Sequence, residues 1–188
     1  MLIRNGGAAD AQAIAALHTA SWRTAYAGIM PDDYLNGPLD AERAALWRRR
    51  LTAAVTPGLF VAEDATALLG FVYLVPTDDG RVLLDNLHAR PGSLRSGIGS
   101  RLLDRGLAWA AAEFPGRAVY LEVLRANTGA IAFYERHGGR RTDARIGRFD
   151  AGFELPEYEY TWDPGGFDYS QLTVATDAVR PSPPSGDR

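Results

Sequence analysis

The stretch of sequence that decides the fold is residues 83–112, and at its centre lies Leu94-Arg95-Ser96-Gly97-Ile98-Gly99-Ser100. A β-favouring apolar run at residues 81–89 precedes this segment, and Pro91-Gly92-Ser93 ends that run. From Ser100 to about residue 114, apolar side chains recur with the helical period. The stretch therefore predicts a strand, a glycine-containing loop and a helix in immediate succession.

A glycine loop in this position is typical of a phosphate-binding site. Glycine lets backbone amides approach a ligand closely, and a helix N-terminus adds unpaired N–H donors and a partial positive charge. The dinucleotide-binding fingerprint requires a glycine where this chain has Leu102, and the P-loop requires a lysine, which the chain lacks altogether. A coenzyme A loop of the form Gln/Arg-x-x-Gly-x-Gly/Ala fits best, and a tight turn before a helix is the purely structural alternative.

Working outward, the remaining sequence predicts one mixed α/β domain over residues 1–163. Helices are expected at residues 8–26, 39–51 and 128–137, and strands at 2–4, 58–63, 67–75, 118–124, 140–145 and 153–162. The predicted order is β-α-α-β-β-β-α-β-α-β-β. Residues 164–188 are rich in proline, glycine and serine, which predicts a largely flexible tail.

Composition excludes several classes of function. The chain has no cysteine, which rules out disulfides, thiolate zinc sites and cysteine nucleophiles. A net charge of −3 argues against nucleic-acid or anionic-membrane binding. His18, His88 and His137 are scattered along the sequence, so no metal site is expected. A signal peptide and a membrane-spanning run are also missing, which predicts a cytoplasmic location.

Three ordered motifs resemble the GCN5-related N-acetyltransferase (GNAT) superfamily, in its bacterial small-molecule branch, over residues 2–162. They are Ala9-Asp10-Ala11 with Trp22-Arg23 and Tyr26; Asp85-Asn86-Leu87-His88-Ala89-Arg90-Pro91 with the loop and Ser100-Arg101-Leu102-Leu103; and Leu121-Glu122-Val123, Asn127, Ala130, Phe133-Tyr134 and Gly138. The resemblance implies the GNAT fold, a twisted, mixed, mostly antiparallel sheet of six to seven strands flanked by about four helices. Leu94 and Arg95 depart from the family pattern, which has Gln or Arg followed by Gly.

The resemblance also implies acetyl-CoA as cosubstrate and a set of residues that bind it. The thioester arm would lie against the strand ending in Leu87, His88 and Ala89. Its pyrophosphate would lie on Arg95, Ser96, Gly97, Ile98, Gly99 and Ser100, and further contacts with the coenzyme would come from Leu94, Asn127, Ala130 and Tyr134. Tyr134 would donate a proton to the departing thiolate; the alternative is an aromatic core residue. Asn127 is also suited to capping the helix that follows it.

Carboxylates are the candidate general bases, because an aliphatic ammonium with a pKa of about 10.4 must lose a proton before it attacks. Asp85 is the first candidate and Glu122 the second, and a structural role is the alternative for each. Trp22 and Tyr26 share a helical face with His18, and they either line the acceptor site or form a packing stripe. The cluster at residues 48–50 is interpreted as a solvated helix face.

The predicted function is transfer of an acetyl group from acetyl-CoA to a primary amine of a small molecule, by direct attack in a ternary complex. The alternatives are a non-catalytic acyl-CoA-binding sensor module and an acetyltransferase acting on protein N-termini or lysines. The expected partners are acetyl-CoA and an amine, with a homodimer possible by analogy with the family. The sequence does not identify the acceptor, since one fold serves many substrates.

Overall fold

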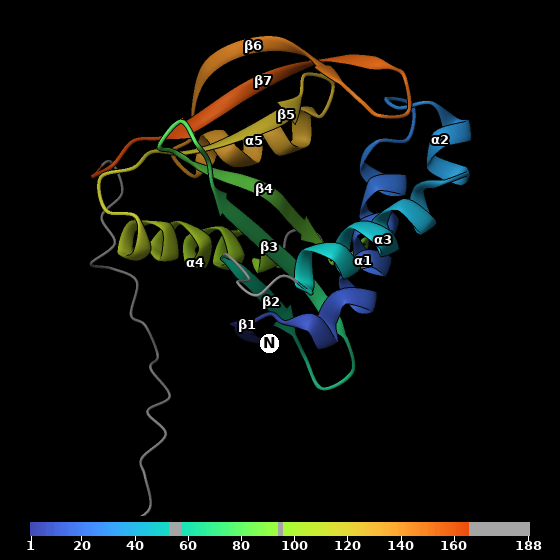
Figure 1. Cartoon of the computed structure of the whole chain (residues 1–188), viewed down its shortest axis with the longest axis horizontal. Helices are drawn as coiled ribbons and strands as arrows, with labels where there is room; N and C mark the ends of the chain where they lie inside the picture. Colours follow the sequence, from blue (N-terminus) through green and yellow to red (C-terminus); the bar gives the residue numbers. More distant parts are fainter. Residues whose placement is uncertain (53–57, 94–95, 166–188) are drawn as a thin grey trace, which may run out of the picture.

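The computed structural model describes residues 1–52, 58–93 and 96–165. Within these ranges the strands form one seven-stranded sheet in the order β1-β2-β3-β4-β5-β7-β6 (Figure 1). All neighbours are antiparallel except β4 and β5, which are parallel. The strands are β1 (Leu2–Asn5), β2 (Leu59–Glu63), β3 (Leu68–Pro76), β4 (Val82–Ala89), β5 (Val119–Leu124), β6 (Arg140–Arg148) and β7 (Glu154–Trp162).

The helices confirm the predicted order with one addition. In the described part of the chain they are the 3-10 turn η1 (Ala8–Asp10), α1 (Ala11–Ala25), α2 (Asp32–Asn36), α3 (Leu39–Leu51), α4 (Ile98–Glu113) and α5 (Thr128–Arg136). Short α2 was not predicted, because Pro31 and the two following aspartates were interpreted only as a break. The same residues also start a helix, with Pro31 at the N-cap and both carboxylates in the first turn.

Each face of the sheet has its own core. On one face, α4 inserts Leu102, Leu103 and Leu107 against Val72 and Leu74 of β3, and all five side chains are fully buried. The opposite face is covered by the N-terminal helices α1 and α3, with Ile14, Trp47, Val61 and Phe71 among the buried side chains. Consecutive residues of β3 therefore point to opposite cores, as the alternation of a strand requires.

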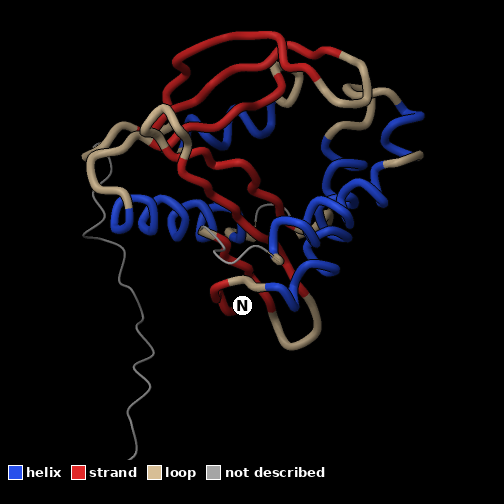
Figure 2. The backbone as a smooth tube through the Cα atoms, viewed as in Figure 1, coloured by secondary structure: helices blue, strands red, loops and turns tan. Residues whose placement is uncertain are grey.

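The sheet divides between its two parallel strands. β4 and β5 pair only at Val82↔Val119 and Leu83↔Tyr120, after which β4 follows β3 and β5 follows β7. A register shift in the β3–β4 pairing accompanies the divergence. Figure 2 shows the two groups of strands separating from this point. On the β5 side, the carboxyl end of β4 therefore has no paired strand within the described residues.

Glycine at position 70 lets the start of α4 lie close to β3 and β4. A Cβ there would lie 2.7 Å from the His88 carbonyl oxygen and 3.0 Å from Ile98 Cγ2. We expect Gly70→Ala to lower the free energy of unfolding by about 1–3 kcal/mol, the usual cost of overpacking. Denaturant unfolding measures it. Gly7→Ala is the control, because a Cβ at that extended residue would meet nothing within 4 Å; equal stability of the two variants would contradict this packing.

None of the helices in the described residues is long and apolar enough to cross a membrane. The proposed tail, residues 164–188, falls outside the described residues except for its first two positions.

Candidate functional site

Helix α4 begins with an open N-terminus. Its N-cap is Gly97, in the left-handed conformation with φ 80° and ψ 0°, which glycine adopts most readily. A Cβ on Gly97 would meet nothing within 4 Å, and no side chain in the described residues caps the helix. The first-turn N–H groups and the positive end of the helix dipole thus suit an anion.

The predicted loop residues divide into three groups. Leu94 and Arg95 lie outside the described residues. Ile98 is buried and anchors the helix start in the core. The helix begins two residues before the predicted Ser100, so Gly99 and Ser100 belong to its first turn and offer backbone amides. Ser96 donates its hydroxyl hydrogen to the Ser93 carbonyl at 2.6 Å, which shapes the turn before the helix.

Helix α5 packs against the N-terminus of α4 and forms a hydrogen bond with it. Phe133 lies over Gly99, with ring atoms 3.5 Å from where a Cβ would be. His137 Nδ1 is 2.8 Å from the Phe133 carbonyl oxygen, which can only accept, so this nitrogen carries the proton. His137 Nε2 therefore accepts from the Ser100 hydroxyl at 2.9 Å. These contacts bring Tyr134 of α5 to the same end of the molecule as the open helix N-terminus.

Tyr134 and Asn127 lie on α5 as the sequence predicts. Asn127 is the N-cap, and its Oδ1 accepts from the Ala130 amide at 3.2 Å. Tyr134 follows Ala130 by one helical turn and packs edge-on against Trp162, with ring centroids 6.0 Å apart. Burial raises the pKa of Tyr134 above its ordinary value, and nearby Tyr26 adds to the effect. The hydroxyl therefore stays protonated at neutral pH.

The aromatic stripe of α1 reaches this tyrosine. His18, Trp22 and Tyr26 pack in sequence with centroid distances of 5.2 and 5.1 Å, so they share one face. Burial and the charge of Glu157 raise the pKa of Tyr26 to about 12, while a hydrogen bond from the Asn127 side chain acts the other way. Tyr26 consequently connects α1, α5 and β7.

Glu157 is a site residue that the sequence reasoning missed. Its side chain is 12% exposed, and burial raises the pKa of its carboxyl, with Arg145 at 3.7 Å opposing the rise. Gly147 on β6 makes room for it, since a Cβ there would collide with the Glu157 carboxylate. The alternating pattern at residues 154–160 places Glu157 and Glu159 on one face of β7. Burial of that face depends on tertiary packing, which the pattern does not reveal.

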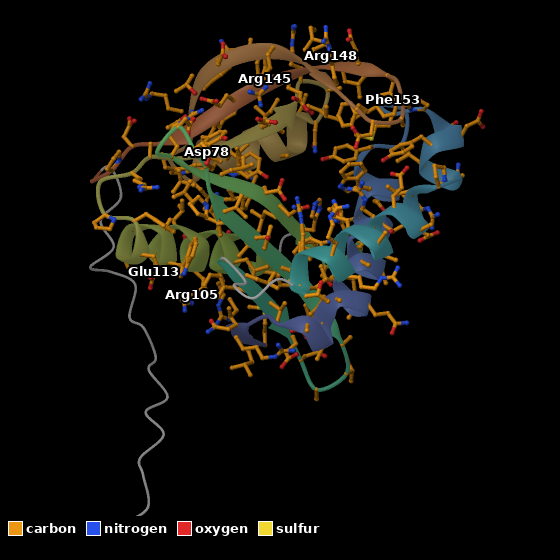
Figure 3. The ribbon with its side chains drawn as sticks, in the orientation of Figure 1. Asp78, Arg105, Glu113, Arg145, Arg148 and Phe153 are labelled. Atoms are coloured by element: carbon orange, nitrogen blue, oxygen red, sulfur yellow. The ribbon has the colours of Figure 1, made fainter. Side chains whose placement is uncertain are left out.

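The two predicted carboxylates are both ion-paired. Asp85 lies 2.5 Å from Arg50 Nη1, and it also accepts from the Asn86 amide. Glu122 pairs with Arg145, which projects from β6 in Figure 3. Arg50 is half-buried and lies over the Trp47 and Tyr73 rings at 5.3 and 5.0 Å, so the prediction of a solvated face is wrong for this residue.

Two of the histidines come together. The rings of His18 and His88 lie 4.5 Å apart, although the sequence separates them widely. Trp47 Nε1 donates to His18 Nδ1 at 3.0 Å, and Ser21 Oγ lies 3.0 Å from His88 Nδ1. Burial, helped by the charge of Arg43, lowers the pKa of His88 to about 3, so His88 is neutral at physiological pH. The described residues contain no group of three metal-ligating side chains.

The turn of the β6–β7 hairpin closes over the end of β5. Phe153, labelled in Figure 3, packs edge-on against Tyr34 of α2 at 5.3 Å. The unpredicted helix thus links the hairpin to the α1 end. Beside this contact a cleft of about 460 Å³ is lined by Ile29, Leu124, Arg125, Ala126, Leu155, Pro156 and Tyr158. The cleft runs along the chain neighbours of Glu157.

Two bacterial proteins with similar sequences are named as N-acetyltransferases. An uncharacterised N-acetyltransferase, YuaI of Bacillus subtilis, is 28% identical over 165 residues, covering 85% of this chain and 91% of its own length. A probable N-acetyltransferase of Mycobacterium tuberculosis, Rv2775, is 29% identical over 140 residues, covering 71% of this chain and 76% of its own length.

Solved structures share the fold at lower identity. The PaiA N-acetyltransferase of Thermoplasma acidophilum, solved with coenzyme A, gives a TM-score of 0.64 at 18% identity and covers 86% of this chain and 98% of its own. The yncA protein of Salmonella typhimurium, a putative acetyltransferase solved with acetyl-CoA, gives 0.64 at 18% identity, covering 87% and 93%. The fold predicted from the sequence is therefore confirmed.

The family match settles the assignment. It covers residues 15–139 of the 188, and so includes most of α1, the glycine loop and all of α5. The chain belongs to the acetyltransferase (GNAT) family.

Proposed function

We propose that this protein transfers the acetyl group of acetyl-CoA to a primary amine of a small molecule. The observation that carries the proposal is the open N-terminus of α4 at Gly97, which packs on α5, the helix that carries Tyr134. A pyrophosphate fits there, since a Cβ on Gly97 would have open space and the first turn offers uncapped amides. Bound acetyl-CoA supplies the acetyl group as a reactive thioester.

The residues around the thioester arm have separate tasks. The carboxyl end of β4, at Leu87, His88 and Ala89, offers backbone groups on the side where β5 has turned away. Asn127 and Ala130 form the start of α5 on the other side. Tyr134 supplies the proton for the departing thiolate, because its raised pKa keeps the hydroxyl protonated.

Glu157 is the general base that the geometry favours. Its half-buried carboxyl has a raised pKa and lies next to Tyr26, with Arg145 Nε 3.7 Å away. Asp85 and Glu122 each make a closer ion pair with an arginine. A base whose pKa lies closer to the working pH accepts a proton from an ammonium more effectively. Glu157 and Tyr134 both lie near Tyr26, and in the proposed reaction the acceptor amine lies between this base and the thioester.

Glu157→Gln should lower kcat about 10²–10⁴-fold with little change in the KM for acetyl-CoA, as expected for loss of a general base. The base works only when deprotonated, and its pKa is raised, so wild-type kcat should rise with pH through that raised value. The variant should lose this acidic limb. The pH profile of kcat is the measurement.

Glu154→Gln on the same strand is the control, because Glu154 makes only a surface pair with Arg148. A second probe is Gly147→Ala, which displaces the Glu157 carboxylate without removing it and should also lower kcat. An unchanged acidic limb in Glu157→Gln would remove Glu157 from the base role.

Thiol release tests the function as a whole. Protein and acetyl-CoA are mixed with a panel of small primary amines, and free thiol is followed with time. Amine-dependent release, with the acetylated amine found by mass spectrometry, is the expected result. Tight coenzyme binding without release from any amine would favour the sensor module, and release only with polypeptides would favour a protein acetyltransferase.

A further inference from the structure

Arg43 on α3 carries a positive charge whose one ion-pair partner among the described residues is the adjacent Glu42. Its side chain is 15% exposed, and its Nε is buried with no hydrogen-bond partner in the described part of the chain. The carboxylate within ion-pair range is that of its neighbour Glu42, at 3.7 Å, and this carboxylate already accepts from the Tyr34 hydroxyl at 2.8 Å. A buried cation in such surroundings favours an anionic ligand.

Two more buried donors accompany this guanidinium. Arg43 Cζ lies over the Trp22 ring, 4.7 Å from its centroid, and Trp22 Nε1 is itself buried without a partner among the described residues. His18 packs on Trp22 at 5.2 Å. Because His18 Nδ1 accepts from Trp47, its Nε2 carries the proton, and that nitrogen is also unpaired within the described ranges. All three groups donate, so a ligand rich in acceptor oxygens matches them.

The charges around this cluster reinforce the same preference. His18 and His88 are both neutral, since burial lowers the pKa of each, and the Arg43 charge contributes to both shifts. Arg50, the next arginine along the inner side of α3, is neutralised by Asp85. Arg43 is therefore the charge that a ligand would meet here, with Glu157 further along at Tyr26.

The cluster lies on the acceptor side of the proposed reaction. Trp22 packs on Tyr26, which contacts Asn127 and lies close to Tyr134 and Glu157. In the other direction His18 packs on His88 of β4, the strand proposed to hold the thioester arm. The row from Tyr26 through Trp22 thus connects the Glu157 end with Arg43.

We propose that the acceptor is a primary amine that also carries an anionic oxygen group, a carboxylate or a phosphate, bound by Arg43 with the indole N–H of Trp22. The inference rests on the proposed function and specifies its substrate class. An anionic group pairs the guanidinium and the neighbouring donors at once. A second ammonium group, as in a diamine, would instead meet the Arg43 charge in partly buried surroundings, so polycationic amines are disfavoured.

Four acceptors that differ only at the far end of a short chain test the proposal: β-alanine, its amide, 2-aminoethylphosphonate and 1,3-diaminopropane. The wild-type protein should acetylate one of the two anionic amines with a kcat/KM about 10–100-fold above the amide and the diamine, the range expected of a charge-assisted hydrogen bond. The carboxylate and the phosphonate, compared with each other, identify which anion fits.

Arg43→Met, which keeps an apolar stem against Trp22, should raise the KM for the preferred anionic amine about 10–100-fold. The ratio of kcat/KM for the preferred anionic amine to kcat/KM for the neutral amide should fall by the same factor. Arg48→Met, at an exposed position of the same helix, is the control. Thermal unfolding of each variant checks the fold, and the wild-type acceptor series stands without any variant.

The outcomes separate the two proposals. Thiol release with the amide or the diamine at rates equal to or above the anionic amines overturns the anionic acceptor and leaves the acetyltransferase intact. Release from none of the four acceptors, nor from the wider amine panel, overturns both. Preference for an anionic amine that persists in Arg43→Met overturns the assignment to Arg43.

Discussion

Gly97→Trp is expected to weaken acetyl-CoA binding by at least about 100-fold, since each charge-assisted hydrogen bond to a phosphate is worth about 1.5–3 kcal/mol and several are lost together. The indole would fill the open space over the first turn of α4, where a Cβ now meets nothing within 4 Å. It would also force a bulky side chain into a backbone conformation with φ 80°. Titration calorimetry with acetyl-CoA measures the change.

Gly116→Trp is the matched control, because Gly116 has the same φ of 80° and equally open surroundings in the turn beyond the other end of α4. Both variants carry the same backbone strain and the same added side chain. Only Gly97→Trp should lose the ligand. Equal and tight binding by both variants would show that the α4 N-terminus does not hold the coenzyme.

Tyr134→Phe has the second large effect. Loss of a general acid should lower kcat about 10²–10⁴-fold, while the dissociation constant of acetyl-CoA stays nearly constant. The aromatic ring and its contact with Trp162 are retained, so the fold is preserved. Steady-state kinetics and calorimetry on the same sample separate the two quantities. Tyr120→Phe, which removes a hydroxyl from a strand residue under Arg81, is the control.

The pH profile gives an independent check on Tyr134. Burial raises the pKa of the hydroxyl, so the protonated form persists as pH rises beyond the ordinary tyrosine value of about 10. Wild-type kcat should therefore show no alkaline decline below that pH. A decline near the ordinary value in the wild type that is absent from Tyr134→Phe would contradict the buried, protonated donor.

Most of the fold could be predicted from local pattern. The strand, loop and helix around Gly97 follow from an apolar run, a glycine pair and a helical period, all within neighbouring residues. Asn127 could be placed as a helix N-cap for the same reason, and the structure confirms it. Helix α2 escaped prediction because its five residues are too few for a period to emerge.

The choice among the carboxylates could not be predicted from local sequence pattern. Asp85 and Glu122 were chosen for their positions on strands near the loop, but their ion-pair partners Arg50 and Arg145 come from distant segments. Glu157 became a candidate only once the packing of β7 against α1 and β6 was known. The charges around a carboxylate depend on which segments meet in the fold. The sequence alone therefore does not show which carboxylate is the best candidate for the general base.

The acceptor side follows the same rule. His18 and His88 are separated in sequence, but their rings lie 4.5 Å apart in the fold, and Arg43 lies near them on a third segment. The period-four spacing of His18, Trp22 and Tyr26 predicted their common face. Nothing in that spacing could supply the arginine that faces Trp22, and hence the preference for an anionic acceptor.

Following the acetyl group itself tests the proposed transfer from acetyl-CoA to an amine most directly. Acetyl-CoA labelled with a heavy isotope in the acetyl group is incubated with the protein and the amine panel, and the products are analysed by mass spectrometry alongside thiol release. A labelled N-acetyl amine should form in an amount equal to the free coenzyme, and neither product should accumulate without amine. Labelled acetyl-CoA that binds but remains intact with every acceptor, proteins included, would contradict the proposed transfer.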